Sequence, residues 1–110
     1  MTIRVLHTES SLGWGGQEIR ILTECEYLNS SGEFECSVVC DKGALILTRN
    51  RWPTVRAYPY NLKDKRIECL LSLKSAVQRL QPDIIVSHSS TDSWLAAIVR
   101  KFWFPEIKLV

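Results

Sequence analysis

Two apolar patterns alternate along this chain, and their order limits the folds that it can adopt. Short apolar runs, typical of buried strands, are separated by longer segments whose apolar residues recur at helical spacing. Proline lacks a backbone N–H, so we expect Pro59 to end the third strand and Pro82 to end the third helix. The predicted strands are residues 3–7, 35–40, 54–58, 83–88 and 107–110. The predicted helices are residues 17–28, 44–51, 67–80 and 94–102.

This alternation predicts a parallel sheet, because strands joined through helices pair in parallel with right-handed crossovers and helices on both faces. We therefore expect one α/β domain over residues 1–110, with a Rossmann-like three-layer fold. A chain of 110 residues buries enough surface to fold without a disulfide or a metal. In such folds ligands bind beyond the carboxyl ends of the strands, which directs attention to the loops after the first and fourth strands.

Charge and hydropathy exclude several classes of partner. Fourteen basic and twelve acidic residues leave a net charge of +2, without a run of like charges, so we expect no nucleic-acid partner. No apolar run is long enough to span a membrane, and the first residues lack the features of a signal peptide. We therefore expect a cytoplasmic protein, with peripheral contact at the inner face of the membrane left open.

The cysteines are expected to be buried apolar side chains. Cys25, Cys36, Cys40 and Cys69 match no common zinc spacing, and cytosolic chains seldom keep structural disulfides. Free cysteine behaves as a small hydrophobic residue. We therefore predict no zinc site among these cysteines, and nothing else in the sequence indicates a metal or a bound cofactor.

The loop after the first strand is rich in glycine and leads into a helix. Gly13, Gly15 and Gly16 lie in the stretch HTESSLGWGGQE. Glycine lets a ligand approach the backbone, and the free amides at a helix start attract anions, so this loop is either a phosphate site or an ordinary flexible turn. A nicotinamide dinucleotide is not expected, because Glu18 stands where the fingerprint needs its third glycine and the loop is too long.

The loop after the fourth strand consists of polar residues, HSSTDSW at positions 88–94. They offer hydrogen bonds to sugar hydroxyls, with Trp94 available for the apolar face of a sugar. Alternatively, Ser90, Thr91 or Asp92 caps the following helix. His88 is either a general base, a phosphate partner or a structural residue. The motifs of serine hydrolases, P-loop proteins and HExxH metalloproteases are missing from the sequence.

Basic residues gather between the second and third predicted helices. We interpret them as a solvated face or as contacts to lipid headgroups or to a phosphorylated acceptor. They are Arg49, Arg51, Lys63, Lys65 and Arg66.

Two longer motifs together carry a family resemblance. The strings VLHTESSLGWGGQEIRIL at 5–22 and PDIIVSHSSTDSWLAA at 82–97 closely resemble the amino-terminal half of bacterial family 4 glycosyltransferases, which have the two-domain GT-B fold. The resemblance covers essentially the whole chain. It implies retaining transfer of a sugar from a nucleotide-sugar to an acceptor, such as a lipopolysaccharide, another cell-surface glycan or a lipid-linked sugar.

The resemblance also implies a division of roles. This domain would bind the acceptor, while a carboxyl-terminal domain beyond this chain would hold the nucleotide. Backbone amides of the glycine-rich loop would contact the donor diphosphate, and no metal would be needed. His88 is the one catalytic candidate that the resemblance offers. The candidate substrate-binding residues are Gly15, Gly16, Glu18, His88, Ser89, Ser90, Thr91 and Asp92.

Two departures from the family pattern limit the prediction. Val86 stands where relatives often have a histidine, which argues against acid–base chemistry in this loop. Further family motifs would lie beyond Val110, so we expect residues 1–110 alone to be inactive in sugar transfer. The alternative is a non-catalytic Rossmann-like module that binds a nucleotide or phosphate. Sugar transfer requires Gly16 and Ser90 to lie on the same rim of the molecule.

Overall fold

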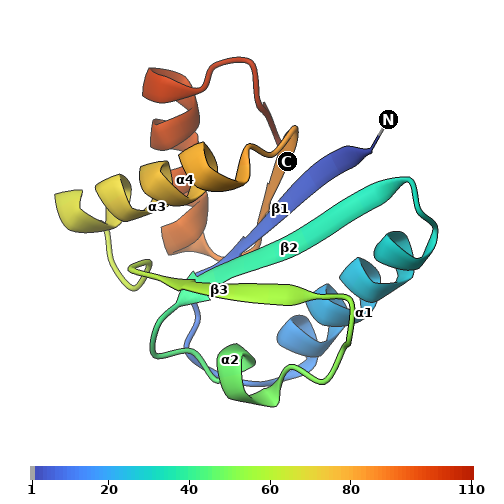
Figure 1. Cartoon of the computed structure of the whole chain (residues 1–110). Coiled ribbons are helices and arrows are strands. Elements are labelled where there is room, and N and C mark those ends of the chain that lie inside the picture. Colours follow the sequence, from blue (N-terminus) through green and yellow to red (C-terminus); the bar gives the residue numbers. More distant parts are fainter. Residues whose placement is uncertain (1) are drawn as a thin grey trace.

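The computed structural model describes residues 2–110, which form one sheet with helices on both faces (Figure 1). All strand pairs are parallel, and the strand order is β3-β2-β1-β4-β5. This confirms the predicted Rossmann-like α/β fold. The elements are β1 (Ile3–Glu9), α1 (Gly16–Ser30), β2 (Phe34–Asp41), α2 (Ile46–Arg49), β3 (Arg56–Tyr60), α3 (Ile67–Leu80), β4 (Ile84–Ser87), α4 (Ser90–Trp103) and β5 (Lys108–Leu109).

The strand order reverses beside β1. β2 and β3 follow β1 on one side of the sheet. The chain then crosses through α3 to β4, which pairs with the other side of β1. Such a reversal leaves a crevice between the loops at the carboxyl ends of the two central strands. The loops after β1 and β4 are therefore neighbours.

The core has one apolar cluster on each face of the sheet. Alternate residues of a strand point to opposite faces, so Val38 packs toward α1 and α2 while Val39 packs toward α3 and α4. Ile21 and Leu22 of α1 are fully buried in the first cluster, and Leu95 of α4 is fully buried in the second. Both loops at the reversal therefore rest on helices with well-packed inner faces.

Two boundaries differ from the prediction. β3 continues through Pro59, which pairs in register with Cys40, because β3 is an edge strand and proline's missing N–H faces no further strand. α4 begins at Ser90 and not near Trp94, so the polar residues predicted as loop form its first turn. The other elements agree with the prediction to within a few residues. No helix within residues 2–110 is long and apolar enough to cross a membrane.

Candidate functional site

Side chains from β1, α1 and α4 meet where β1 and β4 end. Gln17 Nε2, one residue after Gly16, donates to Ser89 Oγ, one residue before Ser90, over 3.3 Å. The glycine-rich loop and the polar loop therefore lie on the same rim, as predicted. A separate hollow, lined in part by Arg4, Phe34 and Arg56, lies at the opposite end, where the strands begin.

Asp92 joins the two loops from inside the molecule. It is fully buried in the first turn of α4. Its Oδ2 accepts hydrogen bonds from Thr8 Oγ1 at 2.7 Å and from the His88 amide at 3.0 Å. Its Oδ1 accepts from the Ser10 hydroxyl at 2.8 Å and from the amides of Ser10 and Ser89 at 3.1 Å each. Asp92 thus fixes the backbone after β4 and ties it to the end of β1.

Ser89, and not Ser90, Thr91 or Asp92, is the N-cap of α4. The carboxylate three positions after the N-cap accepts from its N–H, as in a capping box. Ser90 is exposed and Thr91 is partly exposed, so both remain accessible at the rim. Within this polar run, Ser89 and Asp92 therefore hold the loop in place, while Ser90 and Thr91 are accessible to a ligand.

Glu9 is a second buried acid at this rim. It is fully buried at the last position of β1. Its carboxylate accepts hydrogen bonds from the Ser11 amide at 3.0 Å, from Gln17 Nε2 and from Ser89 Oγ. Glu9 therefore connects the glycine-rich loop, the start of α1 and the N-cap of α4. Sequence reasoning missed it, although an acid ending an apolar strand beside a candidate loop was a usable signal.

His88 pairs with a histidine of β1. His88 Nε2 and His7 Nδ1 share a hydrogen bond of 2.8 Å, with the rings 9° from parallel. Burial lowers the pKa of His88 below its ordinary value, and the adjacent His7 acts in the same direction. His88 is therefore mainly neutral at pH 7. His7, which sequence reasoning also missed, is 4% exposed.

The start of α1 presents open backbone. Gly15 is the N-cap, and Gly16 is the first helical residue. A Cβ built on either glycine meets no atom of residues 2–110 within 4 Å, apart from those of its chain neighbours and the backbone of its own helix. The first amides of a helix have no partner within the helix, so these can donate to an anion. Glu18, another predicted binding residue, is 6% exposed in the same first turn.

A hollow beside the glycine-rich loop is lined by Trp14, Arg49, Arg51 and Trp52. The two indole rings lie 6.3 Å apart. Two guanidinium groups and two aromatic rings form a lining that suits a saccharide carrying a negative charge. Of the basic residues that the sequence places between the two helices, Arg49 and Arg51 line this hollow. Arg66 instead pairs with Asp64 at 3.5 Å.

Comparisons with known proteins identify the family and the fold of this chain. A model of Glycosyltransferase Family 4 matches residues 14–110. A glycosyltransferase from Rickettsia africae ESF-5 superposes with a TM-score of 0.76 and 16% identity, over 98% of this chain and 28% of that chain. MurG from Acinetobacter baumannii superposes with a TM-score of 0.75 and 12% identity, over 97% of this chain and 33% of that chain.

This chain thus spans a third or less of either structure, and those likenesses establish its fold. No curated protein sequence matches it. The family match covers most of the chain, including α1 and α4. The chain therefore belongs to glycosyltransferase family 4, with a Rossmann-like domain that matches part of the GT-B fold.

Proposed function

We propose that this chain is the acceptor-binding, amino-terminal part of a retaining glycosyltransferase. The donor is a nucleotide-sugar, and the acceptor is a cell-surface glycan or a lipid-linked sugar. A carboxyl-terminal domain outside this chain holds the nucleotide. Family membership supports the class of reaction. One structural observation carries the assignment of the site: Glu9 and Asp92 hold the two loops together at the reversal of the strand order.

The glycine-rich loop contacts the donor diphosphate through its backbone. The amides at Gly16 and Gln17 lie at the N-terminus of α1, where the helix dipole favours negative charge. Charge develops on the diphosphate as the glycosidic bond breaks, and fixed N–H donors stabilise it without a metal bridge. Gly15 and Gly16 leave open the space that a side chain would fill.

The polar rim orients the acceptor. Ser90 and Thr91 present hydroxyls at the start of α4, and His88 lies beside them. Within residues 2–110, Nε2 of His88 has a partner in His7 and Nδ1 has none, so Nδ1 is available to the acceptor. We assign His88 a binding role, because its Nε2 is already engaged.

The hollow beside Trp14 receives another part of the acceptor. Arg49 and Arg51 pair with a phosphate or a carboxylate, while Trp14 and Trp52 pack against apolar faces of sugar rings. Its position next to the glycine-rich loop supports this assignment, since donor and acceptor must meet there.

The outer face of α3 and α4 contacts a membrane. Phe102 is 67% exposed, and Trp94 and Trp103 are each 39% exposed. Lys74 Nζ lies 5.0 Å from the centre of the Trp103 ring, and Lys101 Nζ lies 5.8 Å from that of Phe102. Aromatic rings beside lysines suit the headgroup region of an anionic membrane. This face supports a cytoplasmic enzyme acting at the inner membrane surface.

A split-enzyme assay tests the proposal. Transfer of a labelled sugar to a lipid-linked acceptor is measured with this chain, with the separately expressed nucleotide-binding domain, and with both. We expect transfer only from the mixture, because each part supplies one side of the cleft. Rapid turnover by this chain alone would contradict the division of roles. Phosphate binding without transfer in the mixture would favour a non-catalytic binding module.

A further inference from the structure

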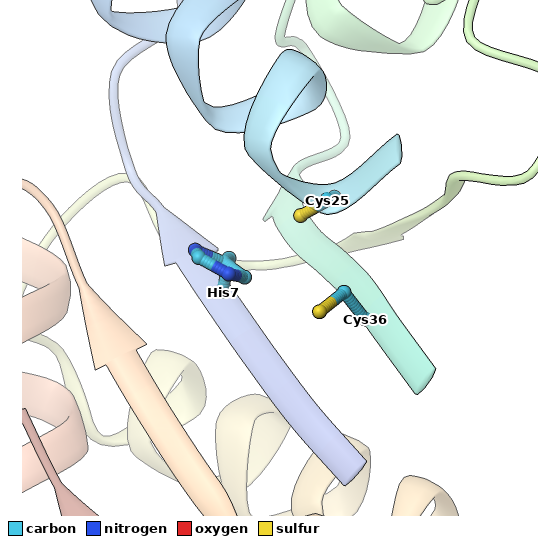
Figure 2. Close-up of side chains that lie close together, drawn as sticks. All are labelled: His7, Cys25 and Cys36. Atoms are coloured by element: carbon cyan, nitrogen blue, oxygen red, sulfur yellow. The ribbon is translucent and has the colours of Figure 1, made fainter. Parts of the chain in front are cut away.

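We propose that His7, Cys25 and Cys36 bind one soft metal ion, Zn²⁺ or Cu⁺, beneath the candidate site. A ring nitrogen of His7 and the two Sγ atoms all lie within 4.8 Å of one another. Figure 2 shows the three side chains converging from β1, α1 and β2. The proposal concerns a site separate from sugar transfer and does not depend on the proposed function.

The strongest evidence is a buried nitrogen without a partner. His7 Nδ1 is hydrogen-bonded to His88, whereas His7 Nε2 is buried and has no hydrogen-bond partner within residues 2–110. An unsatisfied buried polar atom is costly, and folded proteins rarely keep one. A metal ion bonded to Nε2 removes this cost.

The donor set determines the class of metal. Two thiolates and an imidazole prefer soft ions such as Zn²⁺ and Cu⁺ over Mg²⁺ or Ca²⁺. Bonds of about 2.3 Å to sulfur and about 2.0 Å to nitrogen place such ligands roughly 3.5–4 Å apart, which small side-chain rotations reach here. Within the described chain, no fourth histidine, cysteine or acid joins the group.

The surroundings suit a buried ion. Val5 and Val38 are buried in the apolar cluster that also contains Cys25 and Cys36, and His7 is buried beside it. Zn²⁺ with two thiolates, or Cu⁺ with one thiolate and one thiol, adds no net charge to this interior.

His88 lies where it can accept a hydrogen bond from a metal-bound His7. A histidine that binds metal through one nitrogen usually donates its other N–H to a fixed acceptor. Metal on His7 Nε2 places the proton on Nδ1, which then donates to His88 Nε2 at 2.8 Å. Bound metal would therefore also place the proton of neutral His88 on Nδ1, the nitrogen at the rim.

Metal counting tests the proposal. The purified chain is refolded under reducing conditions with equimolar Zn²⁺ or Cu⁺, desalted, and analysed by elemental mass spectrometry. We expect one ion per chain for at least one of the two metals, with a higher melting temperature. The metal that remains bound distinguishes the two ions. Binding of neither ion would overturn the proposal.

Two cysteines of β2 provide a matched pair. Cys36 and Cys40 are both buried on the same face of the strand, but only Cys36 belongs to the group. We expect Cys36→Ser to weaken metal binding at least about tenfold and Cys40→Ser to leave it unchanged. Equal binding by both variants would place the ion elsewhere and overturn the proposal.

X-ray absorption of the unmodified chain provides a test that does not depend on the folding of a variant. The proposal requires two sulfur ligands and an imidazole nitrogen around the ion. A shell of oxygen atoms alone would show surface binding and contradict it.

Discussion

The hydroxyl of Thr8 donates a 2.7 Å hydrogen bond to the carboxylate of Asp92, joining two residues 84 positions apart. Thr8 is the penultimate residue of β1, close to the glycine-rich loop, and Asp92 lies in the first turn of α4. Both are fully buried. The shape of the rim is therefore fixed by interior side chains, while its outer surface remains accessible to a ligand.

Removal of the Asp92 charge should destabilise the fold. In Asp92→Asn, an NH₂ group replaces one carboxylate oxygen. It leaves at least two buried donors, which the carboxylate now accepts from, without an acceptor. We expect the free energy of unfolding in urea to fall by about 2–4 kcal/mol. Asp83→Asn is the control, because Asp83 is exposed and accepts from one amide, that of Arg4. Equal losses in the two variants would contradict the central role of Asp92.

Glu9 and Ser89 should be energetically coupled. Ser89 Oγ donates directly to the buried Glu9 carboxylate, so removing either partner should remove the same interaction. A double-mutant cycle of Glu9→Ala and Ser89→Ala should give a coupling energy of about 1 kcal/mol or more. Ser93→Ala replaces Ser89→Ala in the control cycle, since Ser93 bonds to Ser87 and not to Glu9. Additive losses in the first cycle would show that the two loops are held independently.

Gly16→Ala should separate stability from ligand binding. A methyl group at Gly16 meets no atom of the described chain, so the free energy of unfolding should stay constant or rise by about 0.5 kcal/mol. The same methyl group occupies the space proposed for the diphosphate, and the affinity for pyrophosphate in an NMR titration should fall. Gly32→Ala is the control, because Gly32 has a φ of +80° and its replacement should destabilise the fold without affecting binding.

The aromatic face of α4 should govern membrane binding. Phe102→Ser combined with Trp103→Ser should weaken cosedimentation with anionic phospholipid vesicles about tenfold, because two apolar rings are lost. Tyr27→Ser is the matched control, since Tyr27 is 75% exposed on α1, which packs on the other face of the sheet. Equal effects of the two changes would show that exposed aromatics bind vesicles regardless of position.

Local sequence patterns were sufficient to predict most of the fold. α3 spans the predicted residues 67–80, because its apolar residues recur at helical spacing and Pro82 lies just beyond its end. The start of α4 was misplaced because STDS has little apolar character. The three-residue spacing between Ser89 and Asp92, which form reciprocal cap contacts, was the signal that identifies its true start.

The interior of the site could not be predicted in the same way. The buried carboxylate of Glu9 is satisfied by partners from a loop, from α1 and from a residue 80 positions away. The group of His7, Cys25 and Cys36 likewise depends on the packing of α1 against two strands, and their spacing along the chain gives no sign of it. Such contacts arise from tertiary packing and carry no local periodicity.

Backbone NMR of the 110-residue chain tests the central claim most directly. The chain is titrated with pyrophosphate and with a nucleoside diphosphate sugar, and amide shifts are followed residue by residue. We expect the amides of Gly15 and Gly16 to shift on binding. Those of Ser89 and Ser90 should shift with the same apparent affinity, because hydrogen bonds join the two loops. Shifts confined to the hollow near Arg4 and Arg56, or to one of the two loops alone, would contradict a shared binding rim.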